Sequence, residues 1–256
     1  MVKVHSYKGS QLPKELADFI ITHQNSTLST KSKFSIAISG GSLIKILASG
    51  LLNNSAVEWS KWVIYFSDER LVPLDDEESN YGGFKKAVLD PLAHSGIVGP
   101  TVVTINESLV HSTVSTAKDV EATKKTDRKI AEEYQSEIPQ DGIDLVLLGC
   151  GPDGHTCSLF PGHALLNESH RYVAELSDSP KMPPRRITLT LSYLEKCGTL
   201  CFVATGSGKR EVMADIFSGG STLPCAIVNG LKTSGGICWY VDDDAIEGVE
   251  LKTASD

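Results

Sequence analysis

A loop between residues 149 and 162 carries the side chains best suited to catalysis. It follows an aliphatic run and reads Gly-Cys-Gly-Pro-Asp-Gly-His from position 149. His155 can take a proton from water near neutral pH, and Asp153 lies close enough in the sequence to orient the imidazole ring. We therefore expect general-base chemistry at this loop, although a lone histidine is more often structural.

The same loop contains a rival motif. Its glycines match the G-x-G-x-x-G fingerprint of dinucleotide sites, and an acidic residue, Glu175, follows about twenty positions later. That fingerprint requires a helix that continues past the third glycine, whereas Pro161 and Gly162 would stop a helix here within two turns. The sequence therefore favours a catalytic loop over a dinucleotide site.

A glycine turn follows an earlier apolar run. Ser39, Gly40, Gly41 and Ser42 lie between residues 34–38 and a helical pattern. Glycines let a ligand approach the backbone, and the N-terminus of a helix offers N–H groups to an anion. The turn predicts an anion contact, with a simple strand-to-helix turn as the alternative.

A carboxylate pair beside a guanidinium follows the next apolar run, at residues 68–70. Arg70 can donate two parallel hydrogen bonds to a phosphate, while Asp68 can orient a sugar hydroxyl or a water. The alternative is a surface salt bridge. Their position after a predicted strand favours a functional role, because ligands of open α/β sheets gather at strand carboxyl ends.

Further cations occur in two later segments. Residues 205–210 superficially resemble a P-loop, but the first glycine of that motif would fall at Val203, and Arg210 replaces the required Ser or Thr. Lys209 is nonetheless placed to hold a phosphate at the start of a helix. The proline-stiffened loop 179–186 adds Lys181, Arg185 and Arg186 as further anion contacts, and its alternative is an ordinary surface loop.

These turns require strands and helices in alternation, and the chain supplies them. The predicted strands are 34–38, 62–66, 143–148, 187–191, 200–204 and 237–241. Helical patterns cover residues 12–20, 43–51, 79–87, 107–136 and 207–217, with Ser79 as an N-cap. Nearly unbroken aliphatic character at 143–148 suits a central parallel strand. We expect one α/β domain over residues 1–256, with a mostly parallel, Rossmann-like sheet between helices.

Composition narrows the function classes. The chain has 256 residues, 41% of them hydrophobic, and a net charge of −8. Nucleic acid and anionic membrane surfaces are poor partners for such a chain, since both require clustered cations. The N-terminal residues contain no apolar run typical of a signal or a membrane span, so we expect a cytoplasmic protein. Its six cysteines resemble buried thiols rather than a zinc site or a disulfide framework.

Taken together, these segments resemble the 6-phosphogluconolactonase family, in particular its fungal branch. The Ser-Gly-Gly-Ser turn at 39, Asp-Glu-Arg at 68 followed by Ser-Asn-Tyr at 79, the loop 149–162 and the stretch 181–190 recur in family order. Glucosamine-6-phosphate deaminase is similar in fold, but usually continues after the histidine with an Ala-Phe-Asn-Glu-like segment. Here the continuation is Thr-Cys-Ser-Leu-Phe-Pro.

The resemblance implies hydrolysis of 6-phospho-D-glucono-1,5-lactone in the oxidative pentose phosphate pathway, without a metal or another cofactor. His155 would be the base, Asp153 would orient it, and Asp68 and Asn80 would hold sugar hydroxyls. The phosphate would be shared by the 39–42 turn, Arg70, Lys209, and either Arg185 or Arg186. The alternatives are a deaminase-like isomerase or a sugar-phosphate-binding paralogue without activity. A monomer is expected, with a weak homodimer as the alternative.

Overall fold

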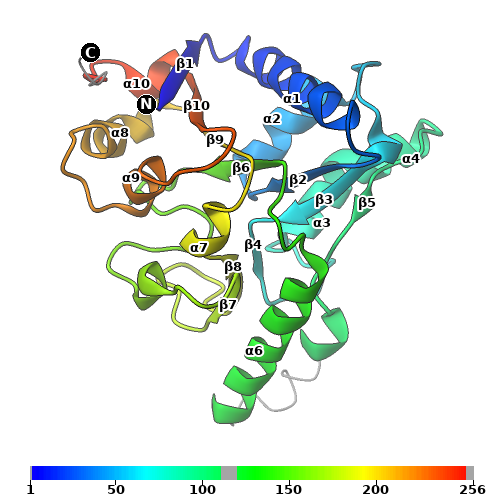
Figure 1. Cartoon of the computed structure of the whole chain (residues 1–256), viewed down its shortest axis with the longest axis vertical. Coiled ribbons are helices and arrows are strands. Elements are labelled where there is room, and N and C mark those ends of the chain that lie inside the picture. The colour runs from blue at the N-terminus through cyan, green and yellow to red at the C-terminus, as the bar shows by residue number, and fades with distance from the viewer. Residues whose placement is uncertain (1, 111–119, 252–256) are drawn as a thin grey trace.

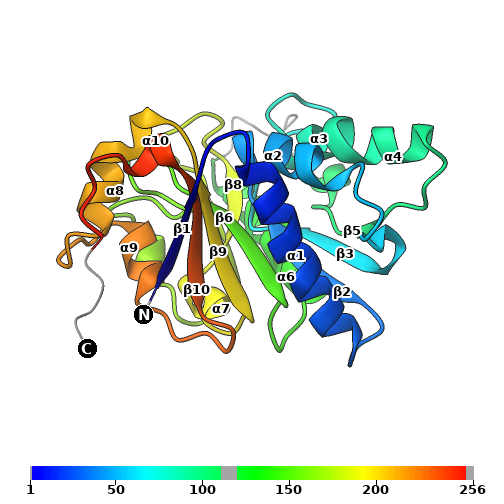
Figure 2. The same ribbon diagram turned by 90° about the horizontal axis from the view of Figure 1, so that it is seen from above.

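The computed structural model describes residues 2–110 and 120–251, and its centre is a seven-stranded parallel sheet between helices (Figure 1). The strands, in spatial order, are β1 (Lys3–Tyr7), β10 (Ile237–Asp242), β9 (Thr199–Ala204), β6 (Leu145–Gly149), β2 (Phe34–Ile38), β3 (Trp62–Phe66) and β5 (Thr101–Val102). The chain runs outward from β2 through β3 to β5, and in the other direction from β6 through β9 to β10 (Figure 2). Such a reversal between β2 and β6 leaves a crevice at their carboxyl ends.

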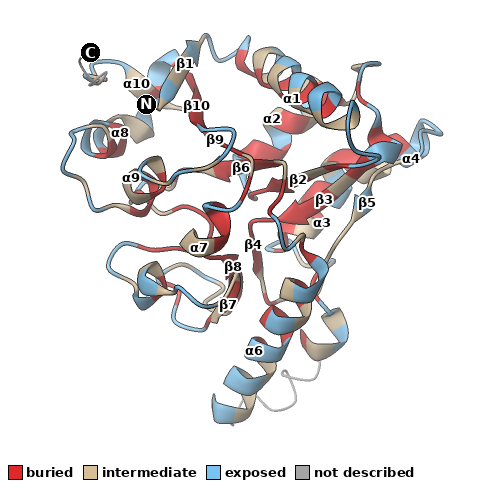
Figure 3. Cartoon of the chain, in the orientation of Figure 1, coloured by how far each residue is buried: buried red, intermediate tan, exposed pale blue. Residues whose placement is uncertain are grey.

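The central strand β6 divides the hydrophobic core in two. Leu145 and Leu147 belong to a cluster on one face of the sheet, while Val146 and Leu148 belong to a cluster on the other. All four side chains are fully buried, as expected for a parallel strand covered on both faces. Figure 3 shows buried residues on the strands of the sheet and exposed ones on the outer faces of the helices.

The helices are distributed over both faces of the sheet. They are α1 (Leu12–Leu28), α2 (Ser42–Leu51), α3 (Asn80–Phe84), α4 (Asp90–His94), α6 (Val120–Glu137), α7 (Leu191–Leu194), α8 (Arg210–Ile216), α9 (Pro224–Asn229) and α10 (Asp243–Ile246). Helices α1 to α4 pack on the face that contains Leu145, and α6 to α9 on the face that contains Val146. None of the helices in the described ranges is long and apolar enough to cross a membrane.

A small antiparallel sheet, which the sequence pattern does not predict, lies beside the main one. It consists of β4 (Asp68–Arg70), β8 (Arg186–Leu189) and β7 (Val173–Leu176). Residues 68–70 are therefore a strand, not a turn. The chain leaves the main sheet at Ser67, whose carbonyl accepts a hydrogen bond from the Leu189 amide. This pairing sets Arg70 directly opposite Arg186.

Several element boundaries differ from those predicted. The strand expected at 187–191 ends at Leu189, because the Thr190 hydroxyl accepts a hydrogen bond from the Tyr193 amide and begins α7. The helix expected at 207–217 begins with a 3₁₀ turn (Ser207–Lys209) and continues as α8. Ser79 is the N-cap predicted for α3. Of the helix expected at 107–136, residues 107–110 and α6 are helical, and residues 111–119 lie outside the described ranges.

Candidate active site

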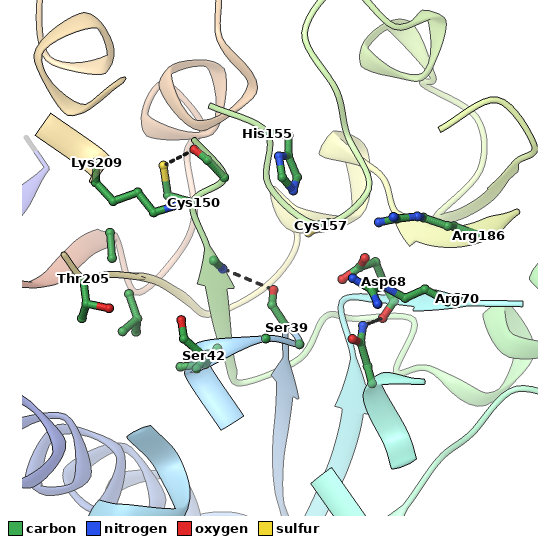
Figure 4. Close-up of a pocket in the computed structure, with 18 residues that line it drawn as sticks. Ser39, Ser42, Asp68, Arg70, Cys150, His155, Cys157, Arg186, Thr205 and Lys209 are labelled. Atoms are coloured by element: carbon green, nitrogen blue, oxygen red, sulfur yellow. Dashed lines mark hydrogen bonds between the residues drawn. The ribbon is translucent and has the colours of Figure 1, made fainter. Parts of the chain in front are cut away.

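A pocket lies at the carboxyl ends of the strands on both sides of the β2–β6 reversal. It is lined by Ser39, Gly40, Gly41, Ser42, Leu43, Asp68, Arg70, Asn80, Gly149, Cys150, Gly151, His155, Cys157, Arg186, Val203, Ala204, Thr205 and Lys209. Figure 4 shows Lys209 and Arg70 on opposite sides of the pocket, with Ser39 and Ser42 between them in this view. Of the residues predicted for the site, all except Asp153 and Arg185 line this pocket.

Asp153 lies behind the histidine instead. His155 Nδ1 is 2.5 Å from Asp153 Oδ1, and the imidazole ring stacks on Phe160 with centroids 4.8 Å apart. Since a carboxylate only accepts hydrogen bonds, Nδ1–H donates to Asp153 and leaves Nε2 as the basic nitrogen. The geometry thus suits Asp153 to orient the ring, as predicted from the sequence.

The loop that carries this pair is tightly folded, and its glycines explain why. The Gly151 amide donates to the carbonyl of His155, and the Gly154 amide donates to that of Gly151. A Cβ atom at Gly151 would lie 1.9 Å from His155 Nδ1, and Gly154 has a φ of +76°. These glycines make room for the histidine and turn the chain, so they do not require a dinucleotide to explain their spacing.

Burial and charge set the protonation of the pair. Burial lowers the pKa of His155 below its usual value of 6.5, a change that Asp153 partly offsets. Burial tends to raise the pKa of Asp153, but the hydrogen bonds and charges of His155 and Lys181 outweigh it and bring the pKa to about 2. At neutral pH the carboxylate is therefore ionised and the imidazole is neutral, which is the state that a general base requires.

Strand β4 presents Asp68 to the pocket. Asp68 Oδ2 accepts a 2.8 Å hydrogen bond from Ser158 Oγ, and its backbone carbonyl accepts one from Asn80 Nδ2. Asn80 in turn packs on Gly40, where a Cβ would lie 1.8 Å from Asn80 Oδ1. Gly40 is therefore needed for the close approach of the 39–42 turn to Asn80.

Glu69 points away from the pocket and joins β4 to α3. Its carboxylate accepts hydrogen bonds from the amides of Arg70, Asn80 and Tyr81 and from the hydroxyl of Ser79. Burial raises its pKa to about 7, against the opposing effect of these amides. The sequence predicted ligand roles only for Asp68 and Arg70, and the alternation of successive strand residues between opposite sides explains why Glu69 faces the other way.

The three predicted arginines have different surroundings. Arg185 binds Asp127 of α6 through two hydrogen bonds, of 2.5 and 3.0 Å, and does not line the pocket. Arg186 lines the pocket, but its guanidinium donates to the carbonyls of Lys181, Met182 and Pro183 and to Ser158 Oγ. With four of five N–H groups in use, Arg186 has at most one for a ligand.

Arg70 is less fully occupied. Its Nη1 donates to the carbonyl and carboxylate of Glu78, at 2.7 and 3.1 Å. Its Nε has no hydrogen-bond partner in the described part of the chain, although it is buried. Such an orphaned donor is rare in folded proteins and leaves Arg70 with hydrogen-bonding capacity to spare.

The glycine turn and Lys209 complete the cationic side of the pocket. Ser39 Oγ lies 2.7 Å from Ser67 Oγ and accepts a hydrogen bond from the Gly149 amide, so it joins β2 to β6. Gly41 has a φ of +71° and precedes α2, whose first residue, Ser42, lines the pocket. Lys209 forms no ion pair with any described residue. It is thus available to an anionic ligand.

Two residues in or beside the pocket have surroundings that the sequence did not predict. Lys181 has its Nζ 3.0 Å from Asp153 Oδ1, although its loop was expected to supply only anion contacts. Cys150 lines the pocket, and all six cysteines are buried free thiols. Within residues 2–110 and 120–251, no group of three or more His, Cys, Asp or Glu side chains is arranged to hold a metal ion.

The chain is similar to known proteins over nearly all of its length. A family model described as glucosamine-6-phosphate isomerases/6-phosphogluconolactonase matches residues 8–239. "6-phosphogluconolactonase 3" of Saccharomyces cerevisiae is 48% identical, with 98% of each chain covered. The 6-phosphogluconolactonase of Homo sapiens is 40% identical over 84% of this chain and 80% of its own. The crystal structure of the 6-phosphogluconolactonase from Leishmania guyanensis has a TM-score of 0.80 at 25% identity, covering 98% of this chain and 99% of the other.

Proposed function

This chain belongs to the glucosamine-6-phosphate isomerase/6-phosphogluconolactonase family, and we propose that it hydrolyses 6-phospho-D-glucono-1,5-lactone to 6-phosphogluconate with His155 as general base. The observation that carries this mechanism is the contact between His155 Nδ1 and Asp153. Because Nδ1 donates its proton to Asp153, Nε2 of the neutral imidazole is available to accept a proton. The pocket beside it also contains cationic side chains. The histidine is followed by Thr-Cys-Ser-Leu-Phe-Pro, as in the lactonases rather than the deaminases.

In the proposed reaction, Nε2 of His155 removes a proton from water while the water oxygen bonds to C1 of the lactone. The carbonyl becomes a tetrahedral oxyanion. When the oxyanion collapses, the bond between C1 and the ring oxygen breaks, and His155 returns the proton to that oxygen. General-base assistance of this kind contributes roughly 10²–10⁴-fold in rate.

The remaining pocket residues would bind the substrate. Asp68 and Asn80 are placed to hold sugar hydroxyls. Arg70 and Lys209 approach the 39–42 turn from opposite sides and would bind the phosphate there, as bidentate and point-charge partners respectively. Arg186 would add at most one hydrogen bond. Arg185 does not belong to this set, because its guanidinium is hydrogen-bonded to Asp127.

We further propose that the enzyme is a cytoplasmic monomer that acts without a metal or nucleotide cofactor. The free thiols in its described ranges fit a reducing compartment. Its net charge of −8 opposes binding to nucleic acid or an anionic membrane. The substrate's own reactivity supports a metal-free mechanism, since a lactone already hydrolyses unaided.

The test is a coupled assay in which the lactone is generated from glucose 6-phosphate and its hydrolysis is followed with 6-phosphogluconate dehydrogenase. We expect wild type to exceed the spontaneous rate, and His155→Ala to lose roughly 10²–10⁴-fold in kcat. The acid limb of kcat/KM should lie below pH 6.5, because burial lowers the pKa of His155.

His163→Ala is the matched control, since His163 also contacts an aspartate, Asp178, at 3.1 Å, but outside the pocket. It should retain wild-type activity. Full activity in His155→Ala would move the base elsewhere, with Asp68 next to test. No acceleration by wild type would refute the proposed function.

A further inference from the structure

We propose that Lys181 is a positioning residue for the general base: it holds Asp153 as an ion and thereby fixes the proton of His155 on Nδ1. This inference rests on the proposed function and deepens it. It gives Lys181 a task different from the substrate contact expected of its basic loop.

Three polar groups meet at one carboxylate oxygen. Asp153 Oδ1 lies 2.5 Å from His155 Nδ1 and 3.0 Å from Lys181 Nζ, while Nζ and Nδ1 are 3.1 Å apart. The ammonium has only donors, and the ionised carboxylate has only acceptors. The arrangement in which both nitrogens donate to Oδ1 satisfies both hydrogen bonds. It excludes a proton on Nε2 of the neutral ring.

Two neighbouring side chains hold the backbone of Lys181 in place. Ser179 Oγ donates to the Lys181 carbonyl at 2.8 Å and accepts from its amide at 3.2 Å. Arg186, which is only 2% exposed, donates to the same carbonyl at 3.0 Å. Two buried side chains therefore fix the backbone from which the Lys181 side chain, itself 37% exposed, reaches Asp153.

Charges from several elements face His155. Asp153 shares its loop, Lys181 comes from the loop before β8, and Asp68 comes from β4. Arg186 reaches the ring of Phe160, on which His155 stacks, and Lys209 approaches Cys150 in the pocket wall. The carboxylates raise the pKa of His155, whereas burial and Lys181 lower it. Removing the lysine charge should therefore raise this pKa, and removing the Asp153 charge should lower it.

The experiment compares wild type, Lys181→Met, Lys181→Arg and Asp153→Asn by two measurements. An NMR titration of the His155 ring protons, assigned by their absence in His155→Ala, reports the pKa without turnover. The pH profile of kcat/KM reports the same group in the reaction. Lys14→Met is the charge-matched control, since Lys14 also pairs with an aspartate but lies on α1.

We expect Lys181→Met to move the His155 midpoint upward by about 0.7 to 1 pH unit, because the lost charge lies 3.1 Å from Nδ1 and is strongly screened by solvent. The acid limb of kcat/KM should move in the same direction. Asp153→Asn should move the midpoint downward and reduce kcat. Lys181→Arg should restore a midpoint close to that of wild type, because it retains the charge, and Lys14→Met should leave it unchanged.

Two results would overturn the inference. In the first, Lys181→Met raises KM while the His155 midpoint and the acid limb stay in place, which would make Lys181 a substrate contact. In the second, Lys181→Met and Asp153→Asn shift the midpoint in the same direction, which would indicate a general disruption of the loop. Failure of the proposed function is a separate result, in which wild type does not hydrolyse the lactone while the NMR titration still reports on Lys181.

Discussion

At the residue scale, two adjacent arginines show that residue type alone does not determine which partners a side chain binds. Arg185 forms a bidentate pair with buried Asp127 and joins the 179–186 loop to α6. Arg186 begins β8 and faces the pocket. Most of its N–H groups donate hydrogen bonds to the carbonyls of its own loop. Neither guanidinium can therefore bind a phosphate in the pocket through two hydrogen bonds. The cations with capacity to spare are Arg70 and Lys209.

Lys209→Ala should raise KM far more than it lowers kcat. A phosphate lies remote from C1, so its ammonium partner contributes equally to the bound substrate and to the transition state. A charge-assisted hydrogen bond of about 1.5–3 kcal/mol corresponds to roughly a 10- to 100-fold increase in KM. Initial rates over a range of lactone concentrations would measure both constants.

The control for this substitution is Lys33→Ala. Lys33 donates to the Ser60 carbonyl, before β3, and does not line the pocket, so both constants should stay at wild-type values. An unchanged KM in Lys209→Ala would remove Lys209 from the phosphate site.

At the element scale, Glu69 fixes β4 against the N-terminus of α3, and with them Asp68 and Asn80. Glu69→Gln should lower the free energy of unfolding by about 1–3 kcal/mol, because either orientation of the amide turns its NH₂ group toward a backbone N–H. We also expect kcat/KM to fall, since the two side chains proposed to bind sugar hydroxyls lose their common support. Urea unfolding and the coupled assay would measure the two effects.

Glu58→Gln controls for the loss of a carboxylate. Glu58 pairs with Lys61 at an exposed position, so this substitution should change stability by no more than about 0.5 kcal/mol. Equal stabilities of Glu69→Gln and wild type would show that the buried carboxylate does not hold the two elements together.

The sequence predicted the five inner strands of the main sheet, which are buried on both faces, and missed the edge strands β1 and β5. Residues 34–38, 62–66, 143–148, 200–204 and 237–241 are each close to an observed strand. The antiparallel sheet was harder to predict, since β4 is short and polar and its partner lies more than a hundred residues away. At Thr190, side-chain capping overrode an apolar pattern that continued to Leu191.

The site was predictable to a similar degree. Strand ends identified the residues that line the pocket, because parallel strands place their carboxyl ends at one edge. The partners of those residues were not predictable in this way. Lys181 reaches Asp153 across 28 positions, and Asp127 reaches Arg185 across 58. Pairings of this kind depend on the packing of loops and helices, for which local sequence contains no signal.

At the scale of the whole molecule, the pocket depends on both halves of the core. The strands before the 39–42 and 149–155 loops contribute side chains to the clusters on both faces of the sheet. The tryptophans report on these clusters separately: Trp59 and Trp62 lie in the one beneath α1 and α2, and Trp239 in the one beneath α8 and α9.

The domain of 256 residues should therefore unfold as one unit, and coincident transitions of different probes are the test of such behaviour. Two variants test this: Trp239→Phe and the double variant Trp59→Phe/Trp62→Phe. In each of them we expect the urea midpoint measured by tryptophan fluorescence to equal the midpoint measured by far-UV circular dichroism. Comparing two signals within one variant removes the differences in stability that the substitutions themselves cause. A Trp239 transition displaced from the circular dichroism curve would instead mean that the cluster beneath α8 and α9 unfolds independently of the one beneath α1 and α2. The pocket, which takes Lys209 from the start of α8 and Ser42 from α2, could then be lost without global unfolding.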